Sequence, residues 1–190
     1  MCFYYFIMIY LASNLSNAIL FNGPPLDKNS NLIDICKTKL KNMFQNSKNF
    51  DKGMDFTAFK GILDIFCHLH QFDENQIKSL FTQVVGEIDK LMDKDQFLIQ
   101  VARVVRRIEL RIQQYYTQYL HLTKMTKNQL INAITDADLN ITDERATELI
   151  KIEMANAEDI SCKEFRNIYA KIYLEYLEEQ KQKLNQSKTD

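Results

Sequence analysis

The sequence predicts an all-α protein of two helical lobes joined by a long central helix. Only four glycines and two prolines occur in 190 residues, whereas a chain rich in β-strands needs more of these residues for its tight turns. Apolar residues instead recur every three or four positions along much of the chain, which is typical of helices with one face in a core. The length and the 46% of hydrophobic residues suffice for one domain or two small lobes.

The first 31 residues form an apolar arm and a linker. Residues 2–12 are almost wholly apolar, and a shorter apolar stretch, residues 18–21, follows four polar residues. Three interpretations stay open for residues 2–21: a signal peptide cleaved near Ala18, a marginal membrane span, or an arm that docks on the protein or a partner. The third includes an extension from a misplaced start codon. Gly23-Pro24-Pro25 then ends any helix and begins the linker.

Apolar stripes with helical spacing follow the linker, and each predicts a helix that faces a core. The stripes comprise Phe59, Ile62, Leu63 and Phe66; Ile77, Leu80, Phe81, Val84 and Val85; Phe97, Val101, Val104, Val105 and Ile108; and Phe165, Ile168, Tyr169, Ile172 and Tyr173. The segments that open at Phe59, Phe97, Leu130 and Phe165 begin 38, 33 and 35 residues apart. Such spacing indicates a repeated helical unit.

Five positions before each opening residue lies another apolar residue, which is surrounded by polar residues. The motifs are Gly53-Met54-Asp55-Phe56-Thr57-Ala58-Phe59, Met92-Asp93-Lys94-Asp95-Gln96-Phe97 and Ile160-Ser161-Cys162-Lys163-Glu164-Phe165, together with residues 141–151. Over residues 32–177 this pattern resembles the EF-hand family, in particular four-hand proteins of the calmodulin, troponin C and myosin light chain type.

The resemblance implies two lobes of paired, degenerate EF-hands, over residues 32–107 and 108–180, with a polar tail over 181–190. It also implies short two-strand contacts between paired loops. These contacts would join Met54 to Met92 and Met125 to Ile160. Residues 97–122 contain no Gly or Pro, so they predict the long helix between the lobes.

The predicted loops lack the oxygen ligands that calcium needs, which include a bidentate Glu at the last position. In residues 47–58 that position is Ala58. Residues 85–96 and the third loop end in Gln, and residues 153–164 keep Glu164 but have two alanines at ligand positions. We therefore expect no cofactor and no calcium. The weak metal candidates are Ser47, Asn49, Asp51, Asp55 and Glu164.

Other site chemistry is sparse. The segment Cys67-His68-Leu69-His70 is the best remaining metal candidate, but neighbouring helical residues do not face one another, and only His121 could add a third imidazole. We expect it to be an ordinary helix end with a half-buried Cys67.

Because no nucleophile motif or phosphate loop occurs, we expect no enzyme. Four cysteines without a Cys-x-x-Cys pair and a net charge of −1 predict a reduced intracellular protein that does not bind nucleic acid.

Two sets of residues are candidates for partner binding. Arg103, Arg107 and Arg111 recur every four residues and form a cationic stripe suited to an acidic filament or microtubule surface, or a solvated helix face. The resemblance implies a second set, apolar grooves that grip an amphipathic helix. Their lining would be Leu63, Phe66, Val101 and Val105 in the first lobe and Ile134, Tyr169 and Ile172 in the second, unless these residues only pack the core.

These observations predict a non-catalytic, calcium-independent adaptor or light-chain-like subunit that binds helices of a larger assembly. The resemblance favours a cytoplasmic location in a cytoskeletal or axonemal (ciliary) assembly. Two alternatives stay open. One is a calcium sensor of the calmodulin type with relaxed coordination in its first and fourth loops. The other is a membrane- or organelle-associated subunit anchored by residues 2–21.

Overall fold

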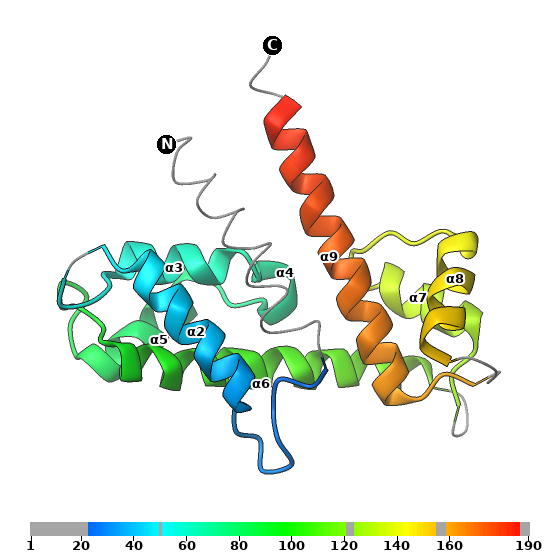
Figure 1. Cartoon of the computed structure of the whole chain (residues 1–190), viewed down its shortest axis with the longest axis horizontal. Helices are drawn as coiled ribbons and strands as arrows, with labels where there is room; N and C mark the ends of the chain where they lie inside the picture. Colours follow the sequence, from blue (N-terminus) through cyan, green and yellow to red (C-terminus); the bar gives the residue numbers. More distant parts are fainter. Residues whose placement is uncertain (1–22, 50, 121–123, 155–158, 187–190) are drawn as a thin grey trace. The chain divides into compact units, whose positions relative to one another are not determined.

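A computed structural model describes residues 23–49, 51–120, 124–154 and 159–186. The described residues are mostly helical and all but without strands, which confirms the all-α class. Figure 1 shows their helices in chain order. They are α2 (Asp34–Ser47), α3 (Phe56–Asp64), α4 (Cys67–His70), α5 (Glu74–Val85), α6 (Lys94–Tyr119), α7 (Lys127–Thr135), α8 (Asp143–Met154) and α9 (Cys162–Gln186).

The chain divides into two compact units, residues 1–108 and 109–190, which we call unit 1 and unit 2. The division falls within α6, so one continuous helix of 26 residues belongs to both units. This helix covers most of the predicted central helix, but it ends at Tyr119 rather than at residue 122. Residues 121–123 lie outside the described part of the chain.

Phenylalanine rings form the centre of unit 1. Phe59 lies between Phe81 and Phe97, with ring centroids 5.7 and 6.4 Å away, and Phe44 contacts Phe97 at 5.5 Å. Since these rings come from α2, α3, α5 and α6, one aromatic cluster joins the four helices. The apolar stripes therefore do turn towards a common core.

Unit 2 has a core of tyrosine and phenylalanine. Phe165 on α9 contacts Tyr116 on α6 and Tyr169 on its own helix, at centroid distances of 5.6 and 6.0 Å. The buried Tyr116 hydroxyl donates to the backbone oxygen of Ile160 at 3.1 Å, which satisfies its polar group. Helix α8 packs against both α7 and α9.

Both expected backbone pairings between loops are present as antiparallel bridges. The N–H groups of Met54 and Met92 donate to each other's carbonyl oxygen at 3.0 and 2.8 Å, and the Ile160 N–H donates to the Met125 oxygen at 2.9 Å. These bridges are isolated and do not extend into sheets. A Cβ at Gly53 would lie 2.5 Å from the Met92 oxygen, so the first bridge requires glycine there.

None of the described helices is both long and apolar enough to cross a bilayer. The apolar segment 2–21, with its three open interpretations, lies outside the described residues. The described chain begins at Gly23, and an antiparallel bridge between Leu26 and Leu32 closes the linker on itself.

Candidate functional site

The helix that leaves each predicted loop begins at a polar capping residue. Asp55, Asp93, Thr126 and Ser161 precede α3, α6, α7 and α9, and each lies three positions before the last residue of its predicted loop. An N-cap side chain accepts a hydrogen bond from a backbone N–H that has no partner inside the helix. Helix capping therefore uses the residues on which calcium binding would depend.

In three loops the final side chain completes a capping box, in which the cap and the third helical residue bond to each other's backbone. The Gln96 N–H donates to Asp93 Oδ1 at 2.8 Å, and the Asp93 N–H donates to Gln96 Oε1 at 2.9 Å. Thr126 and Gln129 form the same pair. In the fourth loop the Ser161 N–H donates to Glu164 at 2.7 Å. The side chains at the bidentate position thus bind the backbone.

Gln96 makes one further contact that spans its loop. Its Nε2 donates to the backbone oxygen of Val84 at 2.7 Å. Val84 lies in the last turn of α5, and Gln96 lies in the first turn of α6. One amide therefore joins the end of the entering helix to the start of the leaving helix, as a cation would, but without a charge.

The first loop keeps the most potential ligands, and its polar groups bond mainly to one another. Asp55 Oδ1 accepts from the Ala58 N–H at 2.8 Å, and the Asp55 N–H donates to Asn49 Oδ1 at 3.0 Å. Asn49 Nδ2 bonds to the other oxygen of Asp55. Asp51 is exposed, and the buried Ser47 hydroxyl has no hydrogen-bond partner. Because the loop supplies few carboxylates, its residues do not fit a calcium ion.

Within the described part of the chain, no group of three or more His, Cys, Asp or Glu side chains is arranged to hold a metal ion. The segment Cys67–His70 forms its own short helix, α4, which is separate from α3. Cys67 is exposed as a residue, but burial raises the pKa of its thiol, which agrees with the expectation of a half-buried sulfur. The helix turns this residue outward while Leu69 and His70 face the core.

His70 is a structural residue that sequence analysis missed. Its side chain is fully buried, with Nε2 2.9 Å from the Leu63 oxygen and Nδ1 accepting from the Phe72 N–H at 2.8 Å. Both ring nitrogens are therefore engaged in the neutral tautomer that carries its proton on Nε2. Burial lowers the pKa of His70, since the charged form loses its hydration.

The four predicted groove residues of unit 1 line one apolar cavity of about 10 Å³. Leu63 and Phe66 come from α3 and the turn after it, and Val101 and Val105 come from α6. The other lining residues are Met43, Ile62, Val104 and Ile108. All eight side chains are at most 5% exposed, so a helix could reach them only after the surrounding helices move apart.

The predicted groove residues of unit 2 also lie in its core. Ile134, Tyr169 and Ile172 are at most 3% exposed. Burial raises the pKa of the Tyr169 hydroxyl, because ionisation there would leave a poorly solvated charge. In unit 1 the structure brings the predicted groove residues together, and in both units it buries them.

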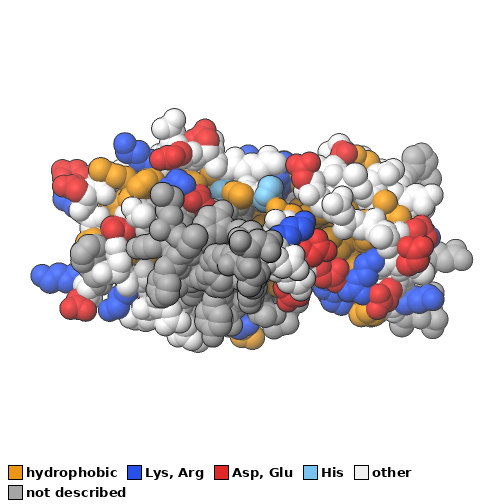
Figure 2. Space-filling model, turned by 90° about the horizontal axis from the view of Figure 1, so that it is seen from above, with side chains coloured by type: hydrophobic (Ala, Val, Ile, Leu, Met, Phe, Trp, Pro, Cys, Tyr) orange, Lys and Arg blue, Asp and Glu red, His pale blue; other side chains and the backbone are white. Residues whose placement is uncertain are grey.

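The predicted arginine stripe lies along α6. Most hydrogen bonds of its arginines go to residues of α6 itself or of α5. Arg103 donates to Gln83 on α5 and to Gln100, and Arg111 donates to the Tyr115 hydroxyl at 3.1 Å. The guanidinium of Arg111 lies 5.4 Å from the Tyr115 ring centroid, within range of a cation–π contact. Arg107 is exposed. On the face shown in Figure 2, acidic and basic side chains of the described residues are interspersed.

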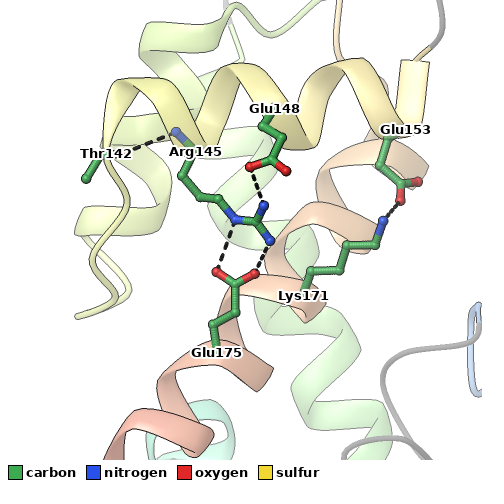
Figure 3. Close-up of polar contacts among 6 residues, drawn as sticks. All are labelled: Thr142, Arg145, Glu148, Glu153, Lys171 and Glu175. Carbon is green, nitrogen blue, oxygen red and sulfur yellow. Dashed lines mark hydrogen bonds and ion pairs between the residues drawn. The ribbon is translucent and has the colours of Figure 1, made fainter.

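Charged contacts join α8 to α9 in unit 2 (Figure 3). Arg145 forms a two-pronged ion pair with Glu175 and also binds Glu148, and these hydrogen bonds raise its pKa. Nearer the loop, Lys171 pairs with Glu153. Burial alone would raise the pKa of Glu153, but the bonds it accepts outweigh that effect and lower it.

A buried ion pair joins α9 to α6 within unit 2. Arg166, only 5% exposed, donates from Nε and Nη2 to the two carboxylate oxygens of Glu109, each at 2.9 Å. No role for Glu109 was predicted from the sequence. No local spacing could pair it with a residue 57 positions away.

Comparisons with protein-family models, with curated protein sequences and with solved structures find no match for this chain.

Proposed function

We propose that this chain is an EF-hand-like protein with four degenerate hands in two lobes, and that it acts as a calcium-independent, non-catalytic structural adaptor. The observation that carries the proposal is the Gln96 amide, which joins the two ends of the second loop where a calcium-binding hand would use a cation. Two further observations support it. They are the bridges of Met54 to Met92 and of Met125 to Ile160.

The helix-loop-helix order supports the assignment of hands. We assign them to α2–α3, α5–α6, α6–α7 and α8–α9, with α6 shared by the second and third hands. Each lobe then contains one bridge between its two loops, within unit 1 or within unit 2.

We propose an amphipathic helix of a larger assembly as the partner. Apolar anchors at helical spacing would replace the contacts that α2, α3 and α6 make around the apolar cavity of unit 1. A cytoskeletal or axonemal assembly is the setting we favour, and the exposed Arg107 is its main support. Such a surface would be acidic, and the attraction would weaken with added salt.

Calcium titration of the full-length chain tests the first part of the proposal. We expect no heat of binding at physiological ionic strength and no change in melting temperature between excess calcium and excess chelator. Calmodulin, titrated in the same buffer, is the positive control. Micromolar binding with a higher melting temperature would instead show that the chain is a calcium sensor.

Amide chemical-shift mapping tests the second part. The labelled full-length chain is titrated, in chelator, with a Leu/Lys peptide of about 20 residues that forms an amphipathic helix. We expect shifts around the predicted groove residues of unit 1, unit 2 or both, and none with a scrambled peptide of the same composition. Shifts restricted to exposed residues outside both grooves would refute helix binding.

A further inference from the structure

We propose that an exposed ridge of α6 in unit 1 binds the carboxylates of an acidic partner helix. The ridge consists of Ile99, Arg103 and Arg107, which recur every four residues, about 6 Å apart along the helix axis. This inference rests on the proposed adaptor function and names the chemistry of its partner. Binding needs only surface side chains to move, and the helices of unit 1 stay packed.

The arginines of the ridge have no carboxylate partner among the described residues. Arg103 donates from Nη1 to the side-chain oxygens of Gln83 and Gln100, at 2.5 and 3.3 Å, and both acceptors are uncharged. Arg107 is exposed and takes part in no ion pair of the described residues. In unit 2, by contrast, both described arginines outside α6 form ion pairs with carboxylates. The positive charge of the ridge is therefore uncompensated.

Helices α5 and α6 offer no unpaired carboxylate near the ridge. Between residues 96 and 119 the only acidic residue of α6 is Glu109, whose two oxygens accept from an arginine of α9. Asp95 lies eight residues before Arg103, about 12 Å along the axis, which exceeds the Debye length at physiological salt. The only acid of α5, Glu74, is its first residue, whereas Gln83 lies in its last turn. An acidic partner would therefore be attracted along the whole ridge.

Gln100 supplies an independent sign of a missing acceptor beside the ridge. Its side chain is fully buried and its oxygen accepts from Arg103, yet its Nε2 has no hydrogen-bond partner in the described chain. A buried N–H without an acceptor is unfavourable, and such groups are rare in folded proteins. When a carboxylate draws Arg103 outward, the Gln100 amide is uncovered, and a carboxylate oxygen then accepts from its Nε2.

The ridge fits a carboxylate-bearing helix better than other anions. Two arginines about 6 Å apart match two carboxylates at positions i and i+4 of a partner helix, and arginine binds carboxylates through paired N–H donors. Ile99 is 52% exposed one turn before Arg103, so a leucine of the partner helix would bury it. A polynucleotide offers no such apolar contact, and a chain with a net charge of −1 lacks the excess of cations that phosphate binding needs.

A peptide titration followed by amide chemical shifts of the labelled full-length chain tests the ridge. The probe is an alanine-based helical peptide of about 20 residues that carries one leucine and two glutamates at four-residue spacing. The control peptide has the same composition with these residues on different faces. We expect shifts at residues 99–107, weaker binding as salt is added, and at least about fivefold weaker binding of the control. Equal binding of both peptides, or shifts confined to other residues, would overturn the proposal.

Matched charge variants make the test specific. Arg103→Gln with Arg107→Gln removes both charges of the ridge, whereas Lys41→Gln with Lys94→Gln removes two charges from exposed positions of unit 1 outside the ridge. We expect the first pair to weaken binding of the probe at least about fivefold and the second to change it less than about twofold. Equal losses in both would indicate a general electrostatic attraction and overturn the site.

Gln100→Leu tests the buried amide. Leucine fills a similar volume without a donor, so the unbound protein should not lose stability in thermal melts. We expect the probe to bind about threefold more weakly, because its carboxylate loses one N–H donor. Unchanged affinity would overturn the role of the amide.

Two other anions test the choice of partner. Phosphatidylserine vesicles and a single-stranded oligonucleotide are added to the same chain and to the Arg103→Gln, Arg107→Gln variant. We expect both to bind more weakly than the probe. Equal or tighter binding of either one through these arginines would overturn the assignment to an acidic helix.

The tests of the proposed function stay separate from this one. The Leu/Lys peptide used for the grooves is basic, so the ridge does not attract it. Failure of the acidic probe with an intact response to the Leu/Lys peptide would refute the ridge alone. Calcium binding with normal binding of the acidic probe would refute the calcium-independent function alone.

Discussion

Replacing Gln96 with alanine should destabilise the junction between α5 and α6 by about 1–3 kcal/mol. The substitution removes two hydrogen bonds, from Nε2 to the Val84 oxygen and from the Asp93 N–H to Oε1. Each bond contributes about 0.5–1.5 kcal/mol net. The bond to Val84 lies in a part-buried setting, where a lost partner is not fully replaced by water.

Gln129→Ala is the matched control. Gln129 occupies the same position of its capping box, where it accepts from the Thr126 N–H at 2.8 Å. Its loss removes the capping contact alone, so the expected cost is about 0.5–1.5 kcal/mol. The difference between the two variants isolates the contact that spans the second loop.

Native-state hydrogen exchange is the assay, because it reports the opening free energy of individual segments in each unit. In Gln96→Ala we expect the last turn of α5 and the first turn of α6 to lose protection together. In Gln129→Ala the loss should be confined to the start of α7. If both variants lose the same free energy, or if α5 is unaffected by Gln96→Ala, then the amide does not close the loop.

Three further predictions concern stability. Gly53→Ala should cost about 1–3 kcal/mol in urea denaturation, because its Cβ would lie 2.5 Å from the Met92 oxygen; a loss below about 0.5 kcal/mol would contradict this. The folded state lowers the pKa of His70, so the neutral ring's contribution to the free energy of unfolding is complete above the unfolded pKa of about 6.5 and is lost as pH falls through the folded pKa. When the free energy of unfolding is measured against pH, His70→Gln should flatten this dependence, and an unchanged slope would refute the prediction. Arg166→Leu should cost about 3–5 kcal/mol by leaving Glu109 unpaired, whereas adding Glu109→Leu should restore most of that loss in the same urea assay; a double variant no more stable than the single one would refute the pairing.

Local and repeated features of the fold were predictable from the sequence. The apolar stripes predicted helices because the helical period is visible within a few turns. The bridge partners, such as Met54 and Met92, were implied by the EF-hand resemblance, which rests on one apolar residue at a fixed distance before each repeat. At the start of α8 the Thr142 hydroxyl accepts from the Arg145 N–H at 3.2 Å, a local capping contact of the kind that sequence can indicate.

Contacts between distant residues were not predictable in this way. Gln96 looked like a missing calcium ligand, and only its distance to Val84 shows that it closes the loop. Arg145 and Glu175 lie 30 positions apart, so no helical spacing connects them. His70 looked like a weak metal candidate because its neighbours in sequence are Cys67 and His68, although its ring is buried against backbone groups. Burial and tertiary distance decided these roles.

In the proposed adaptor, the occupant itself must supply the free energy that opens a lobe. A calcium sensor opens because the ion binds one conformation more tightly than another, whereas a fixed amide such as that of Gln96 favours one state at all calcium concentrations. Shifting a lobe from 1:99 to 99:1 in favour of the open state needs about 5.5 kcal/mol of differential binding. At about 25 cal/mol per Å² this corresponds to roughly 220 Å² of buried apolar surface. Two or three large apolar anchors provide that area, so an apolar helix can open a lobe without any ion.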